Sequence, residues 1–217
     1  MTLHLIDRAA VRSVQSMSKT TMKTAQFTQI TLLVALLAVL AFTPLGFIQI
    51  PPVSITILHI PVIIGAIVMG PRCGGILGLA FGFFSMLSTI FQGGTPIDML
   101  FSPFASGAPV QSLIMCYVPR ILLGVIAGAL YQLLSKKLPV RVSIGVSAGI
   151  SALCHTVLVL GCMWFFFDAI PLKEIFLTIA GINGILELAA GIVVSVCVCV
   201  PLLKYNKTRG LQSQARA

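Results

Sequence analysis

The chain has 217 residues, of which 58% are apolar and only 9% are charged. An ordinary soluble domain is about one quarter charged, so this composition excludes a soluble globule and a disordered chain and predicts an integral membrane protein. The 14 Lys and Arg against 5 Asp and Glu would suggest a nucleic-acid partner in a soluble protein. In a membrane protein the positions of the bases carry the information instead, so no nucleic-acid partner is expected.

The N-terminal tail, residues 1–26, mixes apolar and basic side chains and predicts either a surface-lying amphipathic helix or a disordered segment. The apolar run that follows is longer than the roughly 7–15 residues of a secretory signal and lacks a small-residue cleavage site after it, so we expect an uncleaved first span. The stretch Gln92–Val110 is too rich in Gly and Pro to span. Six spans are predicted, at Phe27–Ile48, Leu58–Gly70, Gly74–Phe91, Gln111–Leu134, Val142–Phe167 and Leu172–Leu203.

The basic residues support this count of six spans. Twelve of the 14 fall in the N-terminal tail, the second and fourth connections and the C-terminal tail, which six spans place on one side of the membrane. The positive-inside rule makes that side cytoplasmic. The predicted fold class is an all-α integral membrane protein. It is a six-helix transmembrane bundle over residues 27–204, with cytoplasmic tails at 1–26 and 205–217.

Glycines recur at four-residue spacing in three of the predicted spans. This spacing places them on one helix face, where backbones can approach closely in the absence of a hydrophobic driving force. The pattern predicts tight packing within the bundle rather than a functional site. The residues are Gly74, Gly78 and Gly82, then Gly124 and Gly128, then Gly145 and Gly149.

Five polar residues lie inside predicted spans, where a bilayer disfavours them: His59, Arg120, His155, Asn183 and Glu187. A helical rise of about 1.5 Å per residue puts all five in the outer half of the membrane. They predict one polar cavity that opens outward and is lined by the second, fourth, fifth and sixth spans. Tyr117, about one turn from Arg120, is a further candidate for this cavity.

Asn183 and Glu187 are four residues apart and share one helix face. Arg120 lies at similar depth, so it is expected either to pair with Glu187 or to bind an anionic ligand through its planar guanidinium. The two histidines are either ligand contacts or polar side chains satisfied within the bundle.

Catalytic motifs are missing from the sequence. It contains no HExxH motif, no nucleophile turn, no Gly-rich phosphate loop and no Cys/His metal spacing, so neither a cofactor nor a metal is expected. An intramembrane enzyme stays open only through His155 with Glu187. A structural protein of an envelope assembly is the other alternative.

Several segments together resemble the substrate-binding S components of energy-coupling-factor (ECF) vitamin transporters, most closely the pantothenate-type branch. The likeness covers residues 27–204. It is carried by Thr43–Ile48, Leu58–Ile67, Gly70–Arg72, Phe101–Phe104, Pro119–Leu122 and Asn183–Glu187.

This resemblance implies six helices, an outward-facing vitamin pocket and work with a transmembrane coupling subunit and two cytoplasmic ATPases in the bacterial plasma membrane. It implies that Arg120 holds a substrate carboxylate and that Asn183 and Glu187 hydrogen-bond hydroxyl and amide groups. If Glu187 neutralises Arg120, a neutral or zwitterionic vitamin fits better, and riboflavin, folate or biotin are alternative substrates.

The resemblance also implies moving loops and a docking face. The two outer loops are expected to gate the pocket, through Gln49 in the first and through Gly93, Gly94 and Phe101 in the second. S components often dock through an Ala-x-x-x-Ala face on the first helix. Here the corresponding small residues are Thr31, Ala35 and Ala38, of which Thr31 and Ala35 have the four-residue spacing.

Overall fold

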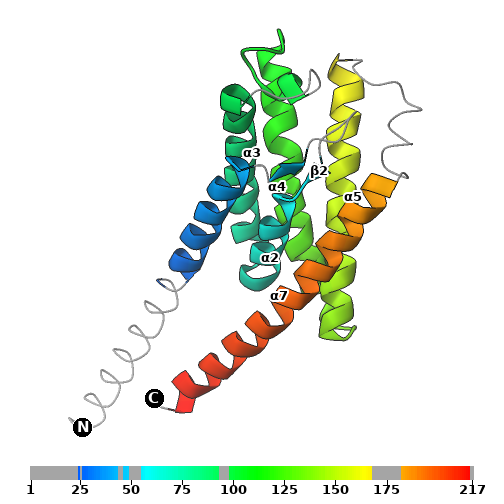
Figure 1. Cartoon of the computed structure of the whole chain (residues 1–217). Helices are drawn as coiled ribbons and strands as arrows, with labels where there is room; N and C mark the ends of the chain where they lie inside the picture. Colours follow the sequence, from blue (N-terminus) through cyan, green and yellow to red (C-terminus); the bar gives the residue numbers. More distant parts are fainter. Residues whose placement is uncertain are drawn as a thin grey trace, which may run out of the picture.

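The computed structural model describes residues 24, 26–43, 46–48, 55–92, 98–167 and 182–215. Within these ranges the chain forms six α-helices, one short 3-10 helix and a pair of two-residue strands. The long helices α3, α4 and α5 stand side by side, α7 crosses the bundle obliquely, and α2 lies among them (Figure 1). In order, the elements are the helix Gln26–Ala41, β1 (Phe47–Ile48), β2 (Ile55–Thr56), α2 (His59–Met69), α3 (Pro71–Gln92), η1 (Asp98–Phe101), α4 (Pro109–Leu134), α5 (Val140–Phe167) and α7 (Ile182–Ala215).

The helices confirm a multi-pass membrane bundle. Four of them are long and apolar enough to cross a membrane: Pro71–Phe91, Pro109–Leu134, Val140–Phe167 and Gly184–Asn206. The other two, Gln26–Ala41 and His59–Met69, are shorter apolar helices. The start of the first helix and the end of α7 lie at the same end of the bundle (Figure 1), as the predicted topology requires.

The first predicted span, Phe27–Ile48, runs too far. Its helix ends at Ala41, and residues 47–48 form β1, which pairs antiparallel with β2 in the register Phe47↔Thr56 and Ile48↔Ile55. The physical reason is Pro44, because the residue before a proline is driven out of the helical region. Of the last predicted span, Leu172–Leu203, the described part begins at Ile182; residues 168–181 lie outside the described ranges, as does most of the tail 1–26.

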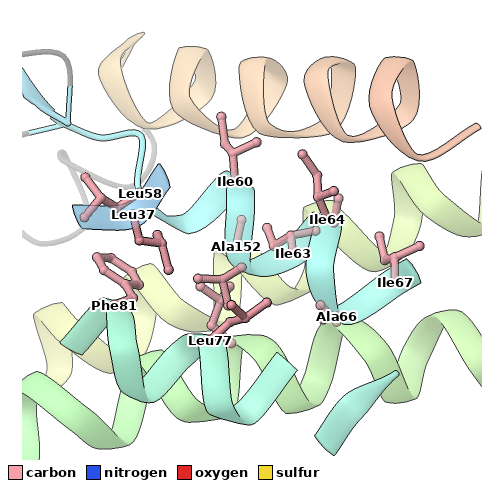
Figure 2. Close-up of a cluster of buried hydrophobic side chains, with 14 of the residues drawn as sticks. Leu37, Leu58, Ile60, Ile63, Ile64, Ala66, Ile67, Leu77, Phe81 and Ala152 are labelled. Atoms are coloured by element: carbon pink, nitrogen blue, oxygen red, sulfur yellow. The ribbon is translucent and has the colours of Figure 1, made fainter. Parts of the chain in front are cut away.

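The core of the bundle surrounds α2. Nine of its eleven residues, His59 through Ile67, are buried, and α2 packs against α3, α4 and α7. Figure 2 shows the isoleucines of α2 between α7 on one side and α3 on the other, with Phe81 and Leu77 of α3 closing the cluster. A helix that is apolar all round and this short is buried as a core element. It brings His59, its first residue, into the interior.

Glycines set the contact between α3 and α4. A Cβ atom at Gly74, Gly78 or Gly82 would collide with the backbone of Gly124, Arg120 or Cys116, respectively. The two series run in opposite directions at four-residue spacing, so the antiparallel helices touch backbone to backbone over three turns. The close-packing interpretation of these glycines is confirmed, and Arg120 lies at the middle of the contact.

Replacing Gly78 by Ala is expected to destabilise the protein by about 1–3 kcal/mol, because the methyl group would overlap the Arg120 carbonyl and push the helices apart. Thermal unfolding of the purified protein in detergent measures the effect. The control is Gly161→Ala in α5, where a Cβ meets nothing within 4 Å. Equal stability of the two variants would contradict the backbone contact described here.

Candidate functional site

A cavity of about 50 Å³ lies between α2, α5 and α7. Space of this size holds a few water molecules. The three titratable side chains on its wall are three of the five intramembrane polar residues predicted from the sequence. The described lining comprises His59, Ala152, Leu153, His155, Thr156, Gly184, Ile185, Glu187 and Leu188.

His59 contacts both the backbone of Thr56 in β2 and the side chain of Glu187. His59 Nδ1 donates a hydrogen bond to the Thr56 carbonyl (2.6 Å) and lies 3.6 Å from Glu187 Oε1. The strand β2 also packs against α7, the helix that carries Glu187. The outer loop that carries β2 is therefore attached to α2 and α7 at the cavity.

Two histidine nitrogens at this site are buried and make no hydrogen bond to the described residues. They are Nε2 of His59 and Nε2 of His155, whose side chains are 2% and 7% exposed. The His59 nitrogen faces Gly191 of α7, where a Cβ would lie 3.0 Å away. Buried polar atoms normally have partners, so unpartnered nitrogens beside a cavity are available to a ligand.

Arg120 sits in α4 close to this cavity but does not line it. Its guanidinium Nη1 donates to the Met115 carbonyl. That carbonyl is available because the residue four positions later is Pro119, which has no N–H to offer it. Pro119 thus leaves the Met115 carbonyl without its helical donor, and the guanidinium of the next residue, Arg120, donates to that carbonyl instead.

Two aromatic rings hold the other faces of Arg120. Its Cζ lies 5.4 Å from the centre of the Phe81 ring and 4.8 Å from that of Phe101. The side chain is only 4% exposed, its Nε has no hydrogen-bond partner, and no described carboxylate contacts it. Cation–π contacts stabilise a buried cation by about 2 kcal/mol, far less than its desolvation costs. Arg120 is therefore a buried cation without a described counter-charge, which is the electrostatic requirement of an anion site.

Phe101 belongs to η1, which covers Arg120 from the loop side. Two side chains at the start of α4 fix η1 in place. Ser112 Oγ donates to the Leu100 carbonyl (2.6 Å), and Cys116 Sγ donates to the Phe101 carbonyl (3.1 Å). The predicted gating residue Phe101 thus stands directly over the predicted anion ligand, whereas Gln49, Gly93 and Gly94 lie outside the described residues.

The remaining predicted site residues are placed as follows. Asn183 is in the first turn of α7, with its side chain outside the described part of the chain. Tyr117 is half-buried and lies against Gly82 between α3 and α4, away from the described cavity lining. Of the two partners considered for Arg120, Glu187 lies instead beside His59, with Oε1 3.6 Å from Nδ1.

Phe81 contacts two of the predicted site residues but is not itself predicted from the sequence patterns. Its ring is fully buried and contacts both the Arg120 guanidinium and the His155 ring, with ring centres 5.9 Å apart in the latter pair. A signal for it exists in the sequence. Phe81 sits within the Gly74–Gly82 series that packs against α4.

Comparison with known proteins identifies the class. The family described as "ECF transporter, substrate-specific component" matches residues 25–202. The chain belongs to this family of membrane transport proteins, so it is a transporter subunit and the intramembrane-enzyme and envelope-structure alternatives fall away. Over 162 residues it is 32% identical to the pantothenic acid transporter PanT of Lactococcus lactis subsp. cremoris (strain MG1363). The aligned region covers 70% of this chain and 80% of that relative.

Removing the charge of Arg120 should not destabilise the protein. A buried ion without a counter-charge costs stability, and an apolar residue of similar volume removes that cost. We expect Arg120→Met to unfold at the same temperature as the wild type or higher when no ligand is added. Arg72→Met, at an exposed position in the first turn of α3, controls for loss of a positive charge. A loss of several kcal/mol in Arg120→Met alone would make Arg120 a structural residue.

Proposed function

We propose that this protein binds pantothenate and delivers it, as the substrate-specific component of an ECF importer, to a coupling subunit and two ATPases. The observation that carries the choice of an anionic vitamin is the buried, unpaired guanidinium of Arg120. Pantothenate has one carboxylate, one amide and two hydroxyl groups, so it needs one cation and several neutral hydrogen-bonding partners. The similarity to a pantothenic acid transporter supports the same substrate.

Arg120 binds the carboxylate in this proposal. Its planar fork suits a bidentate interaction, and the surroundings of low polarity strengthen it. Among the described residues Glu187 lies beside His59 and forms no ion pair with Arg120, so it does not neutralise Arg120 in this proposal. The neutral or zwitterionic substrate that an Arg120–Glu187 pair would favour is therefore not required.

The cavity side chains bind the hydroxyl and amide groups. Glu187 accepts from hydroxyls, and the free Nε2 atoms of His59 and His155 exchange hydrogen bonds with hydroxyl or amide groups. Asn183, one turn before Glu187 on the same helix, completes this set in the proposal. Movement of the two outer loops, with Phe101 leaving the guanidinium, admits the substrate.

Arg120→Gln is expected to weaken pantothenate binding by about 10–100-fold, because a charge-assisted hydrogen bond contributes about 1.5–3 kcal/mol. Isothermal titration calorimetry on the purified protein measures the dissociation constant. Pantothenol, in which an alcohol replaces the carboxylate, serves as the matched ligand and should bind the variant and the wild type alike. Unchanged pantothenate affinity in Arg120→Gln would show that Arg120 does not bind the substrate. A wild type that binds another vitamin and not pantothenate would contradict the proposed substrate.

The first helix supplies the docking face for the coupling subunit in this proposal. Thr31 and Ala35 are exposed one turn apart, and Ala38 is half-buried beside them. Large apolar neighbours share the exposed face, including Leu32 (69% exposed) and Val39 (61%). Small residues among such neighbours permit a partner helix to approach closely.

Ala35→Leu should abolish co-purification with the coupling module and vitamin uptake by cells, while pantothenate affinity of the isolated protein stays within about twofold. The matched control is Ala189→Leu on the exposed side of α7, which should leave both properties unchanged. Normal assembly and uptake in Ala35→Leu would place the docking face elsewhere.

A further inference from the structure

Phe81 occupies a position between the two parts of the proposed site. His155 lines the cavity together with His59 and Glu187, whereas Arg120 does not line it. The Phe81 ring contacts both sides, with its centre 5.9 Å from the His155 ring centre and 5.4 Å from Arg120 Cζ. The ring is fully buried in the core beside Leu37 and Leu58 (Figure 2), so it has no freedom to swing into solvent.

The same ring fixes how the guanidinium points. Among the described residues, Arg120 makes one hydrogen bond, to the Met115 carbonyl, and its Nε has no partner. With so few directional bonds, the two aromatic faces are the remaining restraints on its orientation. Phe101 is carried by η1, a short segment on the loop side, whereas Phe81 is carried by α3, whose backbone touches that of Arg120 through Gly78. Phe81 is therefore the permanent restraint of the pair.

We infer that Phe81 is a specificity-determining positioning residue, which aims Arg120 at the carboxylate and separates a carboxylate subsite from the hydroxyl-binding subsite at His59, His155 and Glu187. The inference rests on the proposed function and adds that different residues bind the two ends of the substrate, on either side of Phe81. The apolar middle of the bound molecule packs on the ring, and the preference for an acid over the corresponding alcohol depends on Phe81 as well as on Arg120.

The test compares two ligands on one protein, pantothenate and pantothenol. The wild type should prefer pantothenate by about 10-fold or more, the value expected of a charge-assisted contact. In Phe81→Leu this preference should fall to about threefold or less, because the cation–π restraint on the guanidinium is lost. Loss of ring packing against the apolar middle, which the two ligands share, does not change their ratio. A merely structural role of Phe81 would weaken both ligands equally and leave their ratio intact.

Controls separate the possible failures. Phe83→Leu, on the same helix and 43% exposed, should keep the wild-type ratio. Phe81→Tyr keeps an aromatic face and should restore most of the preference. A wild type that does not bind pantothenate would sink the proposed function itself. A wild type that binds it, with an unchanged ratio in Phe81→Leu, would overturn only the role of Phe81.

A measurement on the unmodified protein covers the case in which the Phe81 variants fail to fold. With phenylalanine isotopically labelled, nuclear Overhauser contacts are expected between a buried phenylalanine ring and the two groups that flank the amide in the middle of bound pantothenate, the methylene on the amide nitrogen and the hydroxyl-bearing methine. Contacts from the phenylalanine rings only to the methylene next to the carboxylate, or to no part of the ligand, would contradict the inference.

Discussion

The contact between the backbones of α3 and α4 sets where Arg120 and Phe81 lie relative to each other. Three glycines of α3 leave no side chain between the helices, so the Arg120 carbonyl lies against Gly78. That proximity places Phe81, three residues further along α3, against the guanidinium. In a bilayer such packing must supply the stability that hydrophobic burial provides in water, because lipid tails solvate apolar side chains as well as a neighbouring helix does. The same contact that stabilises the bundle thus positions Arg120, the proposed carboxylate ligand.

The proposed site contains a buried charge, which costs stability. Arg120 contacts a carbonyl freed by Pro119 and two aromatic rings but no described carboxylate, while Glu187 lies beside His59. Had the two opposite charges paired, the bundle would gain an ion pair and Arg120 would no longer be free for the carboxylate proposed as its ligand. Keeping them apart fits a protein selected to bind rather than to be maximally stable, as functional sites commonly are. The segment with β2 contacts His59 beside Glu187, and η1 contacts Arg120 through Phe101. A movement of either segment would therefore change the surroundings of these charged groups.

Much of this architecture follows from the sequence. Apolar length and the sorting of basic residues predict the six helices, and the ends of α2, α3, α4 and α5 differ from the predicted ones by three residues or fewer. His59, His155 and Glu187 are predicted to share a cavity because polar side chains cost free energy inside a bilayer and these three lie at similar depth. The structure brings them together around one cavity. What the sequence does not contain is the rotation of each helix. That rotation decides that Arg120 faces Phe81 and Phe101 rather than Glu187, and an apolar residue such as Phe81 does not stand out among so many others.

A structure of the purified protein with bound pantothenate tests the central claim most directly. We expect the carboxylate within hydrogen-bonding distance of the Arg120 guanidinium and the hydroxyl end among His59, His155 and Glu187. Phe101 should have moved off the guanidinium to make room. The contradicting result is a pantothenate held wholly within the cavity between α2, α5 and α7, with Arg120 still covered by Phe81 and Phe101.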